Sequence, residues 1–537
     1  LLVLGLGAAG SCRPPSLPLD DPGLDPPPSD MGIPPCQLGA TRCAQDKAST
    51  EVCRITGWET SASCDLNQGE LCEGGQCLRA CDRLPRGNVG CVFYPANLWS
   101  TSTAGEFGIV ASNTSDRFTA EVTLADARGV VATQTAPPGG QVIFRRPHSE
   151  NKLNQTEQAL KGYKLTSSAP IAVYQFHPID AAQVFSGSAT LLLPEHVMAR
   201  DYFVTSYTYN AEIITSPPQG QGFVTVVAME DNTQVQITVP VPTASGPGVA
   251  GLQRGDTLTK VLSRLEALEV MQANSQEDIS GATVKANKRV VVYGGAGGVT
   301  VPRTAIGGNH FGVQMFPLET WGKRYVATKF KRRNETDFDY FRVIASKDGT
   351  TVTLKGPPGL PTIPTLQKSQ IFEFKTALDF ELTASDPVWV MQHMPAWGDL
   401  TGRYSPMDFP DGVSGRCPFM GTANDVRCLG DANITPLVPV EQYRNDYIFY
   451  VPDTYTYDYI TVTAPPGTRL ALDKTPLVDM PAPIQDSQLG KLIVRVPRGT
   501  HRITGSADFG LLGFGYSYAT SYSYAGGLNL DRINPVE

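Results

Sequence analysis

A short apolar segment recurs four times along this chain at a nearly constant spacing. Its copies start 116, 118 and 118 residues apart, at Phe107, Phe223, Phe341 and Tyr459. After a polar turn, each copy is followed by a segment in which apolar and polar residues alternate, starting at Thr119, Gln234, Thr351 and Thr468. Alternation with a period of two is typical of a β-strand with one buried face. We therefore expect each copy to form a β-hairpin with the segment that follows it.

Two further markers keep the same period. One is a second strand-like run, which begins at Pro170, Arg289, Pro387 and Phe509. The other is an apolar residue followed by proline, ahead of an aromatic residue, at Leu193-Pro194, Phe316-Pro317 and Val438-Pro439. Three independent markers with one period indicate duplication of a unit, and about 111 residues per unit is the size of a β-sandwich. The sequence therefore predicts an all-β fold of tandem antiparallel β-sandwich-like repeats.

The markers divide most of the chain into four predicted repeats, covering residues 92–188, 189–306, 307–428 and 429–537. Residues 256–272 conflict with this pattern, because they combine good helix formers with apolar residues at helical spacing. In the register of the repeat, however, they align with strand-like segments that begin at Gln141, Gln370 and Lys491. We therefore predict strand here, since the context of the repeat overrides local propensity.

Cysteines dominate a short segment ahead of the repeats. Eight of the 11 cysteines lie in residues 36–91, at Cys36, Cys43, Cys53, Cys64, Cys72, Cys77, Cys81 and Cys91. Aliphatic residues are few there, so we predict a small disulfide-rich module whose pairing the spacing leaves open. A zinc ribbon is the alternative, but it needs CxxC pairs and this segment has none. A fifth disulfide is predicted between Cys417 and Cys428.

The first residues look like the end of a secretion signal. Residues 1–11 are apolar or small, and the tetrapeptide that ends at Cys12 resembles a bacterial lipobox, with Ala9 where leucine is usual. Residues 13–35 are rich in proline and aspartate, which keeps such a segment extended. We predict a signal remnant over 1–12, lipidation of Cys12, a linker over 13–35 and a lipid-anchored position at the cell surface or outer membrane. An ordinary secreted protein with one free cysteine is the alternative.

Several segments together resemble the N-terminal domain of IgG-Fc-binding proteins over about residues 92–530. They start at Gly90 (GCVFY), Phe107 (FGIVASN), Asp278 (DISGATV), Arg289 (RVVVYGG), Pro317 (PLETWGKRY) and Gly510 (GLLGFGY). That family includes a mucin-associated animal protein and many bacterial surface lipoproteins. The resemblance implies a secreted, repetitive, non-enzymatic surface module and supplies no catalytic residues. Fc binding belongs to the animal member and is not carried over.

The charge and the motifs exclude several classes of function. The net charge is −8, which argues against a nucleic-acid partner, because such binders neutralise phosphates with basic residues. The sequence has no HExxH zinc motif, no phosphate-binding loop and no GxSxG elbow. We interpret the glycine run at 294–298 as a loop rather than a dinucleotide site, and the basic run at 329–333 as a solvated loop, with a site for an anionic partner as the alternative. We therefore expect no catalytic residue, no cofactor and no metal site.

Two smaller features leave alternatives open. His177 and His393 follow the second recurring run, and we interpret them as turn or packing residues rather than metal ligands. Five aspartates surround the predicted fifth disulfide, at Asp399, Asp408, Asp411, Asp425 and Asp431. We interpret them as an ordinary acidic loop, with a calcium site as the alternative.

Tyrosine is concentrated near the end of the chain. Ten of the 20 tyrosines lie between Tyr443 and Tyr524, several of them in alternation, which places them on one face of a strand. An exposed tyrosine face suits glycan or protein binding. The candidate ligand contacts are Tyr455, Tyr457, Tyr516 and Tyr518. A packing face, in a core or between repeats, is the favoured alternative.

The sequence thus predicts a non-enzymatic surface lipoprotein that binds or adheres to a surface glycan, a matrix component or a protein on a partner cell. Its contact with the membrane would be the lipid anchor only. The main alternative is a self-associating scaffold or filament subunit, in which the repeats only set length. An extracellular hydrolase is the least favoured class, because the repeats carry no catalytic motif.

Overall fold

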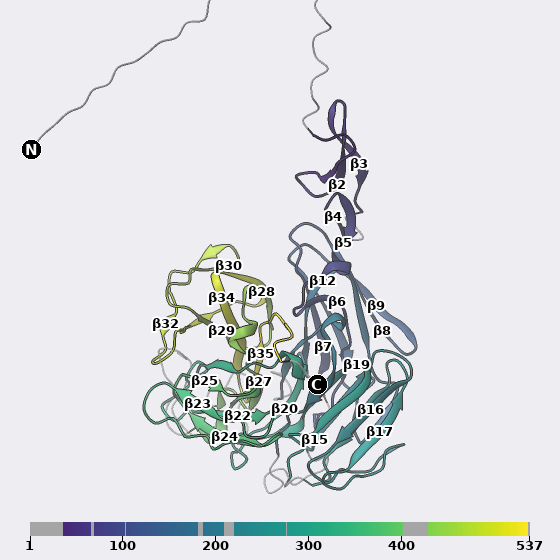
Figure 1. Ribbon diagram of the computed structural model, residues 1–537. Coiled ribbons are helices and arrows are strands. Elements are labelled where there is room, and N and C mark those ends of the chain that lie inside the picture. Colours follow the sequence, from purple (N-terminus) through teal and green to yellow (C-terminus); the bar gives the residue numbers. More distant parts are fainter. Residues whose placement is uncertain are drawn as a thin grey trace, which may run out of the picture.

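The computed structural model describes residues 36–65, 69–102, 104–180, 186–208, 220–274, 277–400 and 428–534 (Figure 1). These residues form antiparallel β-sheets with short 3-10 turns between them, and no α-helix occurs in them. The prediction of an all-β fold built from sandwich-like repeats, preceded by a disulfide-rich module, is therefore confirmed.

One long strand organises the first unit. In β12 (Lys164–Phe176), residues 164–167 pair with one set of strands and residues 171–176 pair with another, so the strand passes from one sheet into the next. The outer sheet has the order β9-β8-β12-β6, and the inner sheet has the order β10-β7-β12-β13. The other strands are β6 (Val89–Phe93), β7 (Glu106–Asn113), β8 (Ala120–Asp126), β9 (Gly129–Ala136), β10 (Gln141–Pro147) and β13 (Ala189–Leu192).

The second and third units repeat this arrangement. The second contains β14 (Ala199–Phe203), β15 (Gly222–Ala228), β16 (Thr233–Thr238), β17 (Thr257–Leu262), β18 (Ala267–Met271), β19 (Thr283–Val299) and β20 (Asn309–Gln314). The third contains β21 (Arg324–Ala327), β22 (Asp339–Ala345), β23 (Val352–Lys355), β24 (Ile371–Thr376), β25 (Phe380–Ala384), β26 (Val388–Met394) and β27 (Asn433–Pro436). Strand β19 is the long strand of the second unit, and in the third unit the long strand is divided into β25 and β26.

The fourth unit closes the series. It contains β28 (Arg444–Val451), β29 (Tyr457–Ala464), β30 (Leu470–Leu472), β31 (Thr475–Pro476), β32 (Ala482–Pro483), β33 (Gly490–Arg495), β34 (Gly499–Ser517) and β35 (Thr520–Ala525). Its long strand is β34. Residues 256–272 form β17 and β18, so the prediction of strand over helix is confirmed.

The predicted hairpins are wrong. Strand β7 pairs with β10 and β12, whereas β8 pairs with β9 and β12, so the two strands lie in opposite sheets of the sandwich. Burial explains why the sequence pattern led to the wrong strand pairing. Almost every residue of β7 is buried because its sheet is covered on both faces, while β8 alternates because one face of its sheet is exposed.

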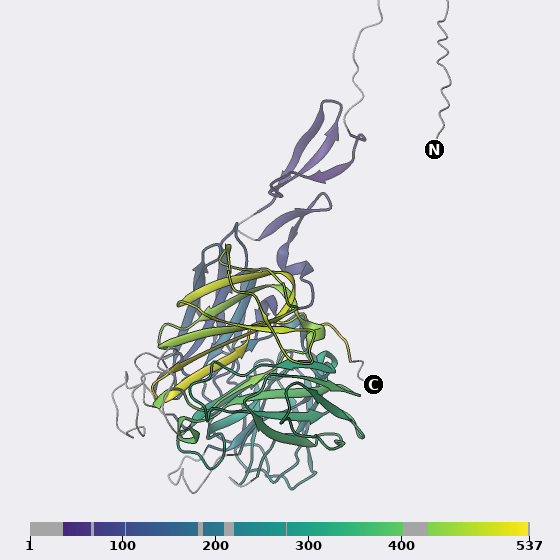
Figure 2. The same ribbon diagram turned by 90° about the vertical axis from the view of Figure 1, so that its left-hand side faces the viewer.

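The four units form a ring. The last strands of the units, β13, β20, β27 and β35, contact one another in a closed cycle at the centre. Buried asparagines join them, since Asn433 Nδ2 donates to the carbonyls of Gly187 at 3.0 Å and Ser521 at 3.1 Å, and Asn309 Nδ2 also donates to Ser521 at 3.3 Å. Figure 2 shows the fourth unit in yellow packed against the third in green. This arrangement differs from the extended rod in which repeats would only set length.

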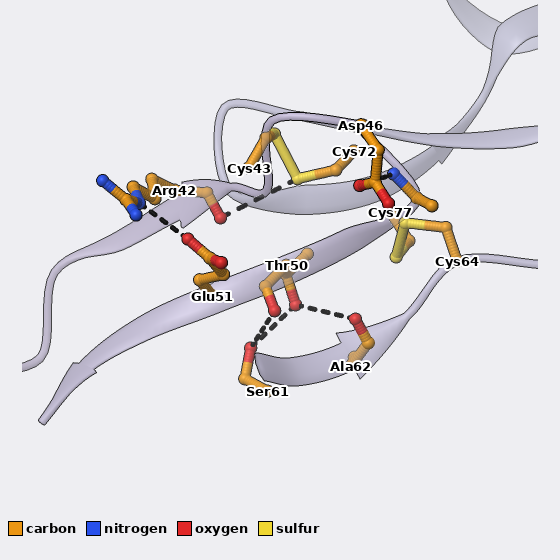
Figure 3. Close-up of a disulfide and its surroundings, with 11 residues drawn as sticks. Arg42, Cys43, Asp46, Thr50, Glu51, Ser61, Ala62, Cys64, Cys72 and Cys77 are labelled. Carbon is orange, nitrogen blue, oxygen red and sulfur yellow. Dashed lines mark hydrogen bonds and ion pairs between the residues drawn. A yellow bond between two sulfur atoms is a disulfide. The ribbon is translucent and has the colours of Figure 1, made fainter. Parts of the chain in front are cut away.

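The disulfide-rich module projects from one side of this ring (Figure 1). It consists of β1 (Thr41–Cys43), β2 (Ser49–Arg54), β3 (Gly57–Ser63), β4 (Glu70–Glu73), β5 (Gln76–Arg79) and the 3-10 turn η2 (Ala80–Arg83). The cysteine pairs are Cys36–Cys53, Cys43–Cys72, Cys64–Cys77 and Cys81–Cys91, and Figure 3 shows the second and third of them. Because Cys91 lies in β6, the last bridge attaches the module to the first unit.

Two predictions about cysteines involve residues outside the described part of the chain. Cys428 is disulfide-bonded, and its predicted partner Cys417 lies outside the described residues. Cys12, the predicted lipidation site, also lies outside them.

A short strand of the first unit extends a sheet of the second. Strand β11 (Glu157–Ala159) pairs with β18, which places Glu157 directly opposite Glu269. Glu269 is fully buried, and its Oε2 accepts a hydrogen bond of 2.8 Å from the Thr225 hydroxyl. Burial raises the pKa of Glu269 from its ordinary value of 4.5 to about 8, and the charge of Glu157 adds to the shift. The carboxyl group is therefore protonated in the folded protein near neutral pH.

This raised pKa makes a prediction about pH and stability. A carboxyl with a raised folded pKa stabilises the fold fully below its unfolded pKa, and this stabilisation is lost as the pH rises through the folded value. We expect the urea midpoint of the full chain to fall between about pH 5 and about pH 9, with a clearly smaller fall in Glu269→Gln. Glu121→Gln, at an exposed position, is the control and keeps the wild-type slope. Equal slopes for wild type and Glu269→Gln would contradict the assignment.

Candidate binding clefts between the units

The four junctions of the ring share one geometry. At each junction, loops at one end of an inner sheet face the outer sheet of the preceding unit. Two junctions are filled by direct contacts. Between the first and second units the Gly162 N–H donates to the Leu265 carbonyl at 3.0 Å. Between the third and fourth units, the Ser487 hydroxyl donates to Glu381 at 2.6 Å, and Lys491 pairs with Asp379 at 2.6 Å.

The junction between the fourth and first units leaves a cleft of about 550 Å³. The first unit supplies residues 114–116 and 138–139, from the loops that follow β7 and precede β10. The fourth unit supplies strand residues from β28 and β34 and the turn at 473–474. We call this space the 4/1 cleft.

Charged groups of the 4/1 cleft are held in place by fixed partners. Arg502 forms a two-point ion pair with Asp446, Nε to Oδ1 at 2.9 Å and Nη2 to Oδ2 at 2.6 Å, and its side chain is 44% exposed. His501 Nδ1 lies 2.7 Å from Asp473 Oδ2. Asp473 and Lys474 both have positive φ, 50° and 68°, as a tight two-residue hairpin turn requires. The wall therefore presents both signs of charge in a defined geometry.

Buried hydrogen bonds join the fourth and first units at the junction that holds the 4/1 cleft. The Tyr174 hydroxyl donates to the carbonyls of Ile448 at 3.0 Å and Gly526 at 2.8 Å, and its ring centroid lies 4.7 Å from that of Tyr524. Burial raises the pKa of Tyr174 well above its usual range, so the hydroxyl stays a donor. Asn88 and Leu528 exchange hydrogen bonds at the same junction, which joins the two ends of the ring.

The junction between the second and third units leaves a similar cleft of about 400 Å³, which we call the 2/3 cleft. Loop residues Ser346, Lys347 and Lys368 of the third unit face the outer sheet of the second unit. The two clefts are built from corresponding elements, because the loops after β7 and β22 occupy the same place in the repeat, as do the outer-sheet strands β28 and β14.

The third sequence marker has a structural role in the last three units. The Tyr202 hydroxyl accepts the Ala199 N–H at 2.8 Å and donates to the Val290 carbonyl at 2.9 Å, where the long strand β19 passes between sheets. Tyr325 and Tyr447 make the same two kinds of bond, to the carbonyls of Val388 and Phe509. Each tyrosine therefore fastens the first strand of its unit to the long strand.

Arg342 makes two ion pairs at the junction of the second and third units. Arg342 Nη1 lies 2.6 Å from Asp278 Oδ2, and Arg342 Nε lies 2.6 Å from Glu373 Oε2. The guanidinium also lies 4.0 Å from the centre of the Tyr207 ring. Burial by itself would raise the pKa of Asp278, but the Arg342 charge together with hydrogen bonds from Ser280 and Arg342 outweighs it and holds that pKa below its ordinary value. Arg342 therefore joins the second and third units through charge.

The predicted tyrosine contacts lie elsewhere. Tyr455, Tyr457, Tyr516 and Tyr518 are each at most 6% exposed. Tyr455 packs edge-on against Tyr522 with ring centroids 4.6 Å apart, and the Tyr516 hydroxyl donates to the Lys331 carbonyl at 2.8 Å. Tyr455 also borders a cleft of about 390 Å³. Their burial means that they form no exposed stripe, and a packing face describes their place in the structure.

Two loop predictions are wrong. Lys329 and Arg333 are buried rather than solvated, and both pair with Asp337, while Arg333 Nη1 also donates to the Leu429 carbonyl at 3.0 Å. The Arg333 guanidinium also lies 5.2 Å from the centre of the Tyr516 ring, which places the segment against the fourth unit. The glycine run 294–298 is part of strand β19 rather than a loop. A Cβ at Gly297 would lie 2.2 Å from Trp99 Nε1, so the glycine permits a close approach.

The histidines and aspartates occupy separate places. His177 Nε2 accepts the Leu98 N–H at 3.0 Å, and His393 is fully buried. Asp431 Oδ2 accepts the Gly308 N–H at 2.9 Å, and Asp399 accepts the Tyr340 hydroxyl at 3.1 Å. In the described part of the chain, no three His, Cys, Asp or Glu side chains gather as metal ligands. Asp408, Asp411 and Asp425 lie outside it.

A ring of β-sandwiches with polar clefts at its junctions, joined to a disulfide-rich module, is the framework of an extracellular binding protein. The chain belongs to the family described as IgGFc binding protein, whose family model matches residues 188–515. No curated protein matches the chain.

The solved structures that the chain matches include one described as "Crystal structure of tetra-tandem repeat in extending region of large adhesion protein". It is 9% identical, the match covers 81% of this chain and 98% of that one, and the TM-score of 0.09 supports no structural conclusion. Among the described residues, no helix has the length and apolarity needed to span a bilayer.

The ion pairs of Arg342 make a stability prediction. Arg342 is 9% exposed, but the side chains of its partners Asp278 and Glu373 are 21% and 35% exposed, so loss of the guanidinium costs about 1.5–3 kcal/mol, as for a hydrogen bond to a charged group. We expect Arg342→Met to lower the free energy of unfolding by this amount in a denaturant titration. The control is Arg145→Met, whose partner Glu106 lies 3.3 Å away in an exposed pair worth less than about 1 kcal/mol. Similar losses in the two variants would refute a special role for Arg342.

Proposed function

We propose that this chain is a lipid-anchored surface protein that binds a protein ligand through the 4/1 cleft. The observation that carries this proposal is the cleft itself, the largest described here, in a chain that belongs to a binding family. The four disulfides of the module fit an oxidising, extracellular environment.

The charges of the 4/1 cleft support recognition of a macromolecule. Arg502 and Lys474 stand beside Asp116 and Asp473, so the wall offers both signs of charge to a complementary partner. Fixed partners, such as Asp446 on Arg502, hold these groups before binding, so less conformational freedom is lost when the ligand docks. A surface glycan is the alternative ligand, because hydroxyl-bearing residues 114, 115, 500 and 504 line the same cleft.

The anchor would be a diacylated Cys12. The linker at 13–35 and the module would then hold the ring away from the outer membrane or cell surface. The module is suited to such a spacer, because the Cys81–Cys91 bridge and a 2.8 Å hydrogen bond from Arg117 Nη1 to the Asp46 carbonyl attach it to the first unit.

A binding assay tests the cleft. The full chain is immobilised and exposed to purified IgG Fc, to extracellular matrix proteins and to a glycan array. We expect specific binding to a protein on this panel, weakened about tenfold, or about 1.4 kcal/mol, by Arg502→Ala combined with Lys474→Asn. Asparagine keeps the positive φ that position 474 requires.

Lys355→Ala, an exposed lysine on β23, is the matched control and leaves binding unchanged. Binding that survives the double substitution would place the site elsewhere. Ordered self-assembly without binding would favour the scaffold alternative, and a hit confined to the glycan array would favour the glycan. Mass spectrometry of the mature N-terminus tests the anchor, since an unmodified Cys12 would refute lipidation.

A further inference from the structure

The 2/3 cleft differs from the 4/1 cleft in charge, although the two have the same architecture. Three lysines line it, Lys285, Lys347 and Lys368, against one lining carboxylate, Asp201. On a chain with a net charge of −8 this is a local reversal of sign. Such a reversal inside a concave surface concentrates anions.

The three lysines are specific to this cleft and are not a general property of the repeat. Strand pairing matches Asp201 with Lys285 in the second unit and Asp446 with Thr504 in the fourth, so Thr504 corresponds to Lys285. The register of the repeat matches Lys347 with Asn113 and Lys368 with Gly139. All three corresponding positions are uncharged, so a shared structural need of the junction does not explain the lysines.

The lysine ammonium groups make only long ion pairs, or none, with other described residues of the protein. Lys285 lies 3.8 Å from Asp201 with its side chain 67% exposed, and Lys347 lies 3.7 Å from Asp386 with its side chain 60% exposed. Lys368 Nζ has no hydrogen bond or ion pair within the described residues. Exposed pairs of this length contribute little stability, so an external anion can compete for the ammonium groups.

Neutral donors and acceptors complete the cleft. Thr283 and Ser346 supply hydroxyls, and Asn534 supplies an amide. Asn534 is held there by hydrogen bonds of 2.9 Å from its N–H to the Glu319 carbonyl and from its Nδ2 to the Leu318 carbonyl. The arrangement suits a ligand that carries both anionic groups and many hydroxyls.

We propose that the 2/3 cleft binds an acidic polysaccharide, through its sulfate or carboxylate groups. A protein partner fits less well, because protein interfaces are depleted in lysine at their centres and depend on accessible aromatic or arginine anchors. The aromatic side chains at this cleft, Tyr202 and Phe203, are at most 4% exposed and offer no such anchor. This site goes beyond the protein ligand proposed for the 4/1 cleft and does not depend on it.

Dextran sulfate tests the proposal with the full chain. Unmodified dextran is the neutral control, polygalacturonate distinguishes carboxylate from sulfate, and polyglutamate represents an acidic peptide. We expect dextran sulfate or polygalacturonate to bind, with affinity that falls as salt rises from about 0.05 M to about 0.5 M, while dextran does not bind. We expect the triple variant Lys285→Gln, Lys347→Gln, Lys368→Gln to bind at least about tenfold more weakly.

A second triple variant controls for net charge. Lys260→Gln, Lys355→Gln and Lys375→Gln remove the same charge from β17, β23 and β24, outside the cleft, at one half-buried and two exposed positions. Equal loss in both variants would show a general charge effect and overturn the site, as would full binding by the first triple variant. Polyglutamate that competes as well as the polysaccharides would overturn the assigned ligand class. Arg502→Ala with Lys474→Asn keeps dextran sulfate binding, which separates this result from failure of the 4/1 cleft.

Discussion

The mutual contact of four inner strands at the centre of the ring is the constraint on which the rest of this structure depends. Strands β13, β20, β27 and β35 each end a unit, and each contacts the inner strands of the units before and after it in the ring. Because these strands are buried on all sides, their polar side chains must find partners within the ring. Asn309 and Asn433 meet this need by donating to backbone carbonyls of other units.

A closed ring of four units has four junctions, and their differences create the surfaces on which function depends. Two junctions are filled, one with an added strand and one with side-chain hydrogen bonds and an ion pair. The other two, which hold the 4/1 and 2/3 clefts, lie across the ring from each other and keep open space between the units. Duplication supplied one architecture, and substitutions at a few loop and strand positions gave the two clefts different charges.

Much of the fold follows from local pattern, and its failures have specific causes. The repeat correctly overrode the helical propensity of residues 256–272, because strand pairing across a unit outweighs differences of a few tenths of a kcal/mol per residue. The prediction of hairpins was wrong because an alternation with a period of two does not show which sheet a strand joins. The buried charges of Lys329 and Arg333 escaped prediction because their partners lie partly on segments distant in sequence.

The sequence by itself determined the repeating unit, its period, its strand content and the disulfide-rich module, since each of these depends on residues close together in the chain or on spacing alone. It did not determine the clefts. Lys285, Lys347 and Lys368 come from two units and are spread over more than 80 residues, and no local pattern distinguishes them from other exposed lysines. Only closure of the ring brings these lysines to one cleft. The same packing buries the tyrosines that the sequence pattern suggested as ligand contacts. Burial and proximity depend on long-range packing, which a local pattern does not contain.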